Sequence, residues 1–235
     1  MIKIILWDFD NTLLDFSIAE KKAILATFDK MNLGKCTQKM INRYVRISDL
    51  YWYKIQCKEI DKDTALVKRY EDFFTEYGID KKYAKEFNEK YSLALADTIV
   101  YNDHSMELLN KFKKDYKQYI VSNGVKSVQQ SRLKASGFDK VVDGCFISDD
   151  IGYEKPSKEF FDYVFSHIEQ VDKKDIMIVG DSLTSDIKGG KNAGIKTCWY
   201  NPKKEGCPGL YLPDMEVQNL NEISAIFDLI NEAKL

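Results

Sequence analysis

The sequence predicts an α/β protein, with a doubly wound parallel sheet interrupted by an all-helical insert. Short apolar runs recur at wide intervals, with helical patterns between them, and these runs span 2–7, 119–122, 145–148, 176–180 and 196–200. A run that is apolar throughout, instead of at alternate positions, indicates a parallel strand covered on both faces. Strands that alternate with helices imply right-handed crossovers, and hence a doubly wound sheet.

Helical spacing accounts for most of the remaining chain. In the second half it predicts helices over 103–115, 125–136, 157–168 and 184–193, and a closing helix over 220–233. Residues 17–98 contain no strand candidate, and their apolar residues fall at helical spacing. We therefore expect residues 1–16 and 99–235 to form an α/β core domain, and residues 17–98 to form an all-helical domain.

Composition excludes several classes of protein. The chain has 235 residues, of which 44% are hydrophobic and 13% aromatic, so a packed globular protein is expected. Its 35 basic and 37 acidic residues are interspersed, which argues against a nucleic acid polymer as partner. No apolar stretch approaches membrane-spanning length, and the five cysteines form no C-x-x-C pair. We expect a reduced, cytoplasmic protein with no membrane partner.

Reactive side chains follow four of the predicted strands, where ligands bind in open α/β sheets. They are Asp8, Asp10, Asn11 and Thr12 after the first run, Ser122, Asn123 and Gly124 after the second, Lys155 after the third, and Asp181, Ser182 and Asp186 after the fourth. Each group alone is ordinary for a turn or a helix cap. Because the fold gathers all four strand ends into one crevice, we interpret them together as one active site.

The residue types in this crevice favour phosphoryl transfer. Several carboxylates that converge repel one another unless a cation lies between them, and oxygen ligands without thiolate or imidazole favour Mg²⁺. Asp8 and Asp10 project to different sides of the strand end, so one can attack phosphorus while the other transfers a proton. Lys155 and the metal would neutralise phosphoryl charge, and the Ser122 hydroxyl would hold a phosphoryl oxygen.

Four motifs carry a resemblance to a known family. The stretches "DFDNT", "SNG", "EKP" and "GDSLTSD" resemble, in this order, the four motifs of the haloacid dehalogenase-like superfamily of phosphohydrolases. The resemblance implies a Rossmann-like core of that superfamily, and it implies that the helical insert is a cap similar to that of the subclass with phosphoglycolate phosphatases. The second aspartate, Asp10, disfavours dehalogenation, because dehalogenating members lack it.

The resemblance also implies a role for each motif residue. Asp8 would be the nucleophile and a Mg²⁺ ligand, and Asp10 would be the general acid/base and offer its backbone carbonyl to the metal. Thr12, Ser122 and Asn123 would form hydrogen bonds at the substrate phosphate. Lys155 would stabilise the phosphoryl charge, Asp181 would ligate Mg²⁺, and Asp186 would orient either the water shell of the metal or Lys155.

A finer likeness covers the second half of the chain, from "VSNGVKSVQQSRLKASG" to "MIVGDSLTSDIKGGKNAGIKTCWYN". It is similar to the house-cleaning pyrimidine 5′-nucleotidases, which hydrolyse nucleoside monophosphates, including non-standard pyrimidine nucleotides. The likeness therefore implies a small phosphomonoester substrate of this class. A phosphatase or phosphomutase for a small sugar or acid phosphate is the alternative, followed by a non-catalytic phosphate-binding module. Either a monomer or a homodimer is compatible with the sequence.

Aromatic residues of the insert and of the loop before it are candidates for substrate choice. Phe16 and Trp52 are the preferred contacts of a pyrimidine ring, and Tyr44, Tyr51 and Tyr53 belong to the same group. The alternative is that aromatic residues at helical spacing form the core of the insert itself.

Overall fold

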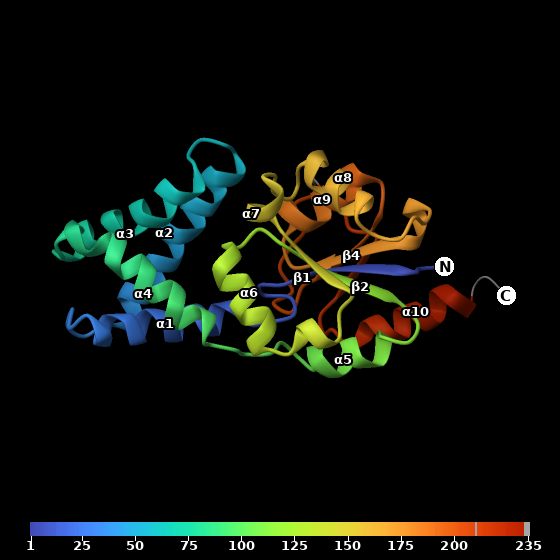
Figure 1. The fold of residues 1–235 in the computed structure, drawn as a ribbon, viewed down its shortest axis with the longest axis horizontal. Helices are drawn as coiled ribbons and strands as arrows, with labels where there is room; N and C mark the ends of the chain where they lie inside the picture. Colours follow the sequence, from blue (N-terminus) through green and yellow to red (C-terminus); the bar gives the residue numbers. More distant parts are fainter. Residues whose placement is uncertain (210, 233–235) are drawn as a thin grey trace. The chain divides into compact units, whose positions relative to one another are not determined.

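The computed structural model describes residues 1–209 and 211–232 and divides the chain into two compact units. The larger unit comprises Met1–Phe16 and Ile99–Leu235, and the helical unit comprises Ser17–Thr98 (Figure 1). The end of the predicted closing helix, residue 233, lies outside the described residues. No described helix is long and apolar enough to cross a membrane.

The larger unit contains a six-stranded parallel sheet, which confirms the predicted fold class. Its strand order is β3-β2-β1-β4-β5-β6, and all neighbouring strands are parallel. The strands are β1 (Ile4–Asp8), β2 (Lys117–Ser122), β3 (Gly144–Ile147), β4 (Ile176–Gly180), β5 (Lys196–Tyr200) and β6 (Met215–Val217). The first five fall on the predicted runs, whereas the sequence analysis missed β6.

Helices cover both faces of the sheet, as a doubly wound fold requires. In Figure 1, α5 and α10 lie on one side of the strands, and α8 and α9 lie on the other. The helices of this unit are α5 (Ser105–Phe112), α6 (Lys126–Ala135), α7 (Ser148–Ile151), α8 (Lys158–Ser166), α9 (Lys188–Ala193) and α10 (Glu222–Glu232). The predicted helix over 184–193 is instead a π-helical turn, Leu183–Ile187, that leads into α9.

The apolar core consists of two layers because successive residues of β1 face opposite sides of the sheet. Ile5 and Trp7 pack in the layer that includes residues of α5 and α10, and Ile4 and Leu6 pack in the layer that includes residues of α8 and α9. All four are completely buried. The continuous apolar run of β1 is therefore the consequence of its central place in the sheet.

The helical unit packs four helices around aromatic side chains. The helices are α1 (Phe16–Lys30), α2 (Gln38–Gln56), α3 (Lys62–Tyr77) and α4 (Ala84–Ala96). Thr37 and Asp61 cap α2 and α3 through their side chains. In the core, the Tyr44 and Tyr70 rings stack with centroids 5.2 Å apart, and their hydroxyl groups lie 2.9 Å from each other.

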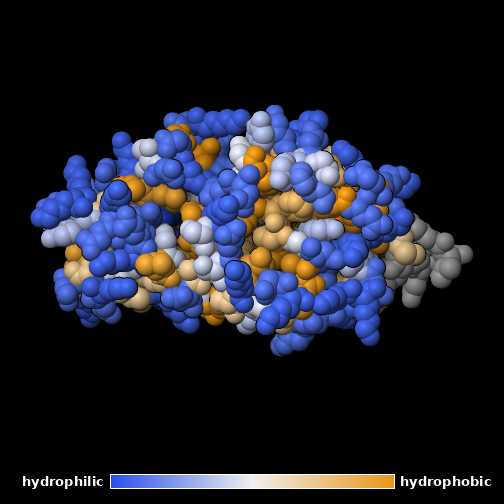
Figure 2. All heavy atoms as spheres, viewed as in Figure 1, coloured by the Kyte–Doolittle hydropathy of each residue, from blue (hydrophilic) through white to orange (hydrophobic). Residues whose placement is uncertain are grey.

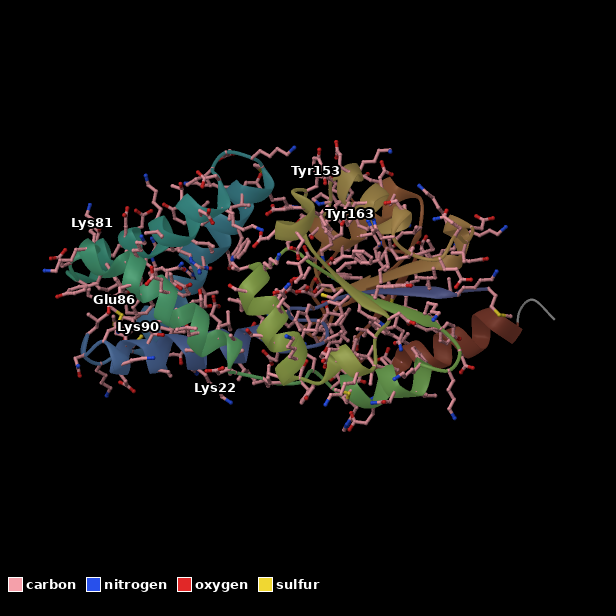
Figure 3. All side chains as sticks on the ribbon, in the orientation of Figure 1. Lys22, Lys81, Glu86, Lys90, Tyr153 and Tyr163 are labelled. Carbon is pink, nitrogen blue, oxygen red and sulfur yellow. The ribbon has the colours of Figure 1, made fainter. Side chains whose placement is uncertain are left out.

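Charged residues cover the outside of the helical unit. Hydrophilic residues make up most of its visible face in Figure 2. On α4, for example, the Lys90 ammonium lies 2.8 Å from the carboxylate of Glu86, one turn earlier (Figure 3). Removal of the aromatic side chains from water stabilises the helical bundle, and the charged side chains keep its outer face in contact with water.

Candidate active site

Three neighbouring strands place the first candidate residues side by side. Asp8 is the last residue of β1 and pairs in register with Val121 of β2, so Ser122 follows one position further along. On the other side of β1, Trp7 pairs with Val179 of β4, and Asp181 comes directly after that strand. The parallel topology therefore brings the predicted residues of three separate motifs to one edge of the sheet.

A tight turn after β1 fixes the Asp8 carboxylate. Asn11 adopts a left-handed backbone conformation with φ of 60°, and its N–H donates to the carbonyl of Leu14 over 2.7 Å. This turn buries Thr12 completely and aims its hydroxyl group at Asp8. The Thr12 hydroxyl donates to Asp8 Oδ2 over 2.9 Å and accepts the Asp181 N–H over 3.1 Å. Its only proton is thus held by Asp8, and its predicted contact with the phosphate stays a prediction.

Lys155 connects two of the carboxylates from a buried position. Its side chain is 1% exposed, and its Nζ donates to Asp8 Oδ1 over 2.7 Å, to Asp186 Oδ1 over 2.6 Å and to the carbonyl of Val121 over 2.9 Å. Burial favours the neutral amine, but the charges of Asp186 and Asp8 outweigh burial and raise the pKa of Lys155. The lysine is therefore a fixed positive charge.

The Asn123 side chain holds the backbone of Lys155 in place. Asn123 Nδ2 donates to the Lys155 carbonyl, and Asn123 Oδ1 accepts the Lys155 N–H, both over 2.8 Å. This pair of bonds explains how a loop far along the chain is pinned next to the end of β2. The predicted role of Asn123 in binding phosphate stays a prediction.

Asp8, Asp181 and Asp186 form a cluster in which one oxygen from each lies within 4.8 Å of the others. Burial raises the pKa of Asp8 to about 7, a rise that Lys155 opposes and Asp186 increases. Burial, together with the charges of Asp8 and Asp186, also raises the pKa of Asp181 well above its ordinary value. Both rises have the same two causes: burial of the carboxyl group, which is the larger, and the negative charges of the neighbouring carboxylates.

A divalent cation fits this cluster. Both oxygens of Asp186 already accept hydrogen bonds, one from Lys155 and one from the Ser182 N–H over 3.1 Å. Among the described residues, by contrast, none donates a hydrogen bond to the Asp181 carboxylate. An oxygen-only set that contains such a carboxylate is suited to Mg²⁺, which prefers one or two carboxylates and keeps several waters.

The Asp10 carboxylate lies outside this cluster and is held by two residues that the sequence analysis did not single out. Its Oδ1 accepts a hydrogen bond from Arg132 Nη1, and its Oδ2 accepts one from Gln129 Nε2 over 2.6 Å. The predicted metal contact of Asp10 is its backbone carbonyl, and this contact stays a prediction. Gln129 and Arg132 lie one turn apart on α6, the helix that begins just after the "SNG" stretch.

Comparison with known proteins identifies the family of this site. Residues 5–200, the larger part of the chain, match the family described as haloacid dehalogenase-like hydrolase. The chain belongs to the haloacid dehalogenase-like hydrolases. All four predicted motifs lie within the matched residues.

Three curated relatives share about a third of their aligned residues with this hydrolase. The putative HAD-hydrolase YfnB of Bacillus subtilis (strain 168) is 34% identical over 97% of this chain and 96% of that protein. The pyrimidine 5′-nucleotidase PynA of Streptococcus pneumoniae is 32% identical, over 85% of this chain and 84% of its own length. The pyrimidine 5′-nucleotidase YjjG of Escherichia coli (strain K12) is 33% identical over 60% of this chain and 63% of its own length.

A solved structure supports the same fold for the hydrolase. The crystal structure of YfnB bound to magnesium superimposes with a TM-score of 0.89 at 33% identity, and covers 96% of this chain and 98% of that one.

The aromatic candidates for substrate contact are distributed over both units of the hydrolase. Tyr44 and Tyr51 are buried in the core of the helical unit, in agreement with the alternative interpretation of this group. Trp52 is half-buried on α2, and Lys62 Nζ lies 5.9 Å from its ring centroid. Phe16 is half-buried in the larger unit, and the Arg132 guanidinium lies 5.8 Å from its ring centroid. Contact of Phe16 and Trp52 with substrate stays a prediction.

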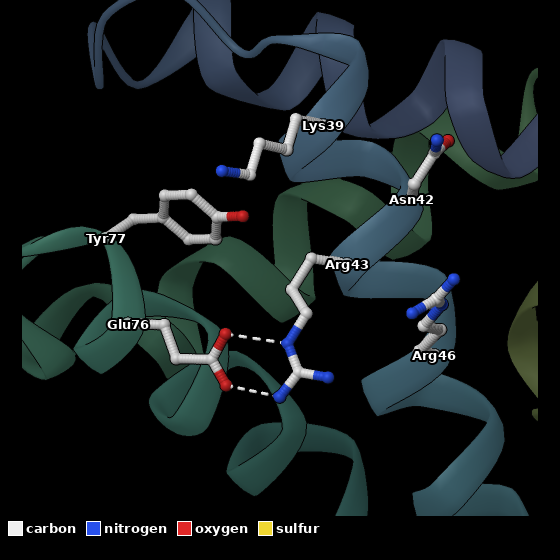
Figure 4. Close-up of a pocket in the computed structure, with 6 residues that line it drawn as sticks. All are labelled: Lys39, Asn42, Arg43, Arg46, Glu76 and Tyr77. Atoms are coloured by element: carbon white, nitrogen blue, oxygen red, sulfur yellow. Dashed lines mark hydrogen bonds and ion pairs between the residues drawn. The ribbon is translucent and has the colours of Figure 1, made fainter.

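The helical unit also carries an open hollow of about 690 Å³ (Figure 4). It is lined by Lys39, Asn42, Arg43, Arg46, Glu76 and Tyr77. Glu76 binds Arg43 through two hydrogen bonds, of 2.7 and 2.5 Å, which neutralise that guanidinium. No residue of the four motifs lines this hollow. The hollow is therefore separate from the candidate residues at the sheet edge of the larger unit.

Proposed function

We propose that this hydrolase is a Mg²⁺-dependent phosphomonoesterase that acts on pyrimidine nucleoside 5′-monophosphates through an aspartyl-phosphate at Asp8. The observation that carries the proposal is the environment of the Asp8 carboxylate. It ends a central strand, and Thr12 and Lys155 each bind one of its oxygens. A carboxylate fixed in this way can attack phosphorus without first reorganising its surroundings.

The reaction would proceed in two steps, with Asp10 as proton carrier. In the first, an oxygen of Asp8 forms a bond to phosphorus, the bond to the ester oxygen breaks, and Asp10 gives its proton to that leaving oxygen. In the second, water attacks the same phosphorus and Asp10 takes its proton, which releases inorganic phosphate and restores the Asp8 carboxylate. Lys155 would balance the charge of the phosphoryl oxygens, and Ser122 would donate a hydrogen bond to one of them.

Asp8 and Asp181 would hold Mg²⁺, with Asp186 beside them and the backbone carbonyl of Asp10 as a further ligand. When bound, the ion supplies Lewis-acid stabilisation of charge on the phosphoryl oxygens. This assignment is supported by the three converging carboxylates and by the YfnB structure, which is described as bound to magnesium.

Two relatives support a nucleotide substrate. PynA and YjjG are named pyrimidine 5′-nucleotidases, and both share about a third of their aligned residues with this chain. The helical unit is proposed to act as the cap that selects the substrate, with Phe16 and Trp52 as contacts of the nucleobase. Both carry flat rings suited to a pyrimidine face.

A panel of phosphomonoesters tests the proposal. Phosphate release from UMP, dUMP and dTMP would be compared with release from sugar phosphates and phosphoglycolate, each with Mg²⁺ and with EDTA. We expect the nucleotides to have the highest kcat/KM and expect EDTA to abolish turnover. Equal or better hydrolysis of a sugar phosphate or phosphoglycolate would remove the nucleotide part of the proposal. Isomerisation of a sugar phosphate without phosphate release would instead identify a mutase.

The Asp8→Asn variant tests the covalent step. Its amide cannot attack phosphorus, so we expect no turnover, while Thr12 and Lys155 keep a side chain of the same shape between them. Full hydrolysis by this variant would require another nucleophile. Complete inactivity of the wild-type protein on every ester would favour a non-catalytic phosphate-binding module.

A further inference from the structure

The Asp10 carboxylate is bound on both oxygens by side chains of α6. Arg132 Nη1 donates to one oxygen and Gln129 Nε2 donates to the other, over 2.6 Å. Both donors come from residues that are essentially inaccessible to solvent, with Gln129 1% and Arg132 0% exposed. The Asp10 side chain itself is 26% exposed, so one end of the contact is buried and the other remains partly accessible to solvent.

Burying the Arg132 guanidinium in this position costs free energy, because its charge is removed from water. Rings lie near its guanidinium, with the centroid of Phe9 at 5.4 Å and that of Phe16 at 5.8 Å. Its Nε and Nη2 are buried and have no hydrogen-bond partner among the described residues. Asp10 is also its only ion-pair partner there. A buried charge with a single counterion holds that counterion strongly, because separation would leave the charge unpaired.

Arg132 also sets the orientation of the Gln129 amide. Its Nη1 lies 3.3 Å from Gln129 Oε1, so the amide oxygen faces the cation and the NH₂ group faces away from it. The two N–H bonds of that NH₂ group then go to Asp10 Oδ2 and to Ser122 Oγ, the latter over 2.7 Å. One amide therefore links the predicted proton carrier to the predicted phosphate-binding hydroxyl.

The same amide determines what Ser122 can do. A hydroxyl group has two acceptor positions and one proton. Ser122 Oγ accepts from Gln129 Nε2 and from the Gly124 N–H, over 3.1 Å, so both acceptor positions are filled. The hydroxyl proton is left to be donated to an incoming group with a lone pair, such as a phosphoryl oxygen.

Gly124 provides the space that this arrangement needs. A Cβ atom at this position would come within 2.4 Å of Gln129 Nε2 and 2.7 Å of its Cδ. The glycine of the "SNG" stretch is thus required by close approach of the Gln129 side chain, and larger residues there would displace it.

We propose that Gln129 and Arg132 are positioning residues of the reaction: Arg132 fixes Asp10 and the Gln129 amide, and Gln129 directs the Ser122 proton toward the substrate phosphate. The inference rests on the proposed function, since it concerns the residue that delivers the proton to the leaving oxygen. It assigns α6 a part in catalysis although neither side chain touches the reacting atoms.

The dependence on the leaving group tests the role of Arg132. A poor leaving group, the 5′ oxygen of UMP, needs a proton in the first step, whereas the p-nitrophenolate of p-nitrophenyl phosphate needs little help. We expect Arg132→Met to lower kcat/KM for UMP by about ten- to hundredfold, the range typical of residues that orient a reacting group. For p-nitrophenyl phosphate we expect a much smaller loss, and we expect Arg132→Lys to recover part of the activity on UMP.

A double-mutant cycle with Asp10→Asn separates positioning from packing. If Arg132 acts mainly through Asp10, Arg132→Met causes a much smaller further loss in the Asp10→Asn background than in the wild type, and the remainder is the part that acts through the Gln129 amide. Lys134→Met and Gln130→Leu, at exposed positions of α6, are the matched controls and should leave kinetics unchanged. Gln129→Leu and Gly124→Ala provide a second route if Arg132→Met does not fold, and both should raise KM for UMP as well as lower kcat.

The possible outcomes separate this inference from the function beneath it. If the wild type hydrolyses UMP and Asp8→Asn does not, but Arg132→Met and Gln129→Leu behave like the two controls, the inference fails and the function stands. Equal losses on UMP and p-nitrophenyl phosphate that add to those of Asp10→Asn would also overturn it, since they would indicate packing alone. A wild type inactive on both esters would overturn the proposed function and this inference with it.

Discussion

Replacing Lys155 with methionine removes the one cation among the described residues that contacts two carboxylates of the site. Methionine keeps much of the volume and apolar character of the lysine side chain, so the change is mainly one of charge. In the metal-free protein it leaves Asp8 and Asp186, which are 8% and 1% exposed, without their ammonium partner. The backbone carbonyl of Val121 loses its hydrogen bond as well.

The expected loss of stability follows from this burial. Breaking a buried ion pair by removing one partner costs about 3–5 kcal/mol. In a chain of this size, about 1 kcal/mol moves Tm by about 2–4 °C, so the Tm of the metal-free variant should fall by about 6–20 °C. Loss of a charge that stabilises the phosphoryl oxygens should also lower kcat by about 10²–10³-fold.

Added Mg²⁺ should restore the stability of the Lys155→Met variant but not its activity. The variant has a more negative cluster than the wild type, so added Mg²⁺ should raise its Tm by more than it raises that of the wild type, although kcat stays low. Thermal unfolding with EDTA and with Mg²⁺ measures the metal-free Tm and the rise in Tm that Mg²⁺ causes, and UMP turnover measures kcat. Lys158→Met, at a lysine that is 73% exposed, is the matched control. A metal-free Tm within 2 °C of the wild type, or an equal Mg²⁺ response, would refute the reasoning.

Three further predictions concern the carboxylate cluster. Asp181→Asn should abolish the rise in Tm that Mg²⁺ causes and should raise the Tm of the metal-free protein, because it relieves repulsion; calorimetry that finds unchanged Mg²⁺ affinity would contradict this. Gly180→Ala would place a Cβ atom 2.3 Å from the Asp186 carboxylate, so we expect about 1–3 kcal/mol of destabilisation and at least a tenfold loss of kcat, whereas Gly206→Ala, with nothing within 4 Å, should affect neither. Burial raises the pKa of Asp8 to about 7, so the metal-free native state retains a proton that the unfolded chain has lost. Its stability should therefore fall as pH rises from about 4 to 7, and the Mg²⁺-induced rise in Tm should be larger at pH 8 than at pH 5, a trend that thermal scans across this range would reveal or exclude.

The features that sequence analysis predicted are those set by the sheet. The β1 run is apolar at every position because Ile4 and Leu6 enter one core layer while Ile5 and Trp7 enter the other. Once a strand is located, the residue after it must lie at the edge where the other strands end. Asp8, Ser122 and Asp181 needed only that reasoning, whereas the place of Lys155 also depends on the hydrogen bonds of Asn123 to its backbone.

The missed features lack such a signal. In β6, Glu216 is exposed and only Val217 of three residues is buried, so no apolar run marks the strand. Gln129 and Arg132 are polar residues at i and i+3 of α6, a pattern typical of a solvated helix face. Their one distinguishing mark is position, because they occupy the first turns of a helix that starts at a strand end. Side-chain burial, which decides their role, is a property of the tertiary structure.

The charges of the site account for the division of labour among its residues. Four carboxylates, those of Asp8, Asp10, Asp181 and Asp186, gather around two buried cations, Arg132 and Lys155, among the described residues. When all four are ionised, two negative charges are left over, and a phosphate dianion would add to them. Under the proposed function, a divalent cation held by Asp8 and Asp181 would offset that excess before the substrate arrives. Arg132 contacts Asp10 separately, so the Asp10 side chain keeps its place outside the cluster of Asp8, Asp181 and Asp186.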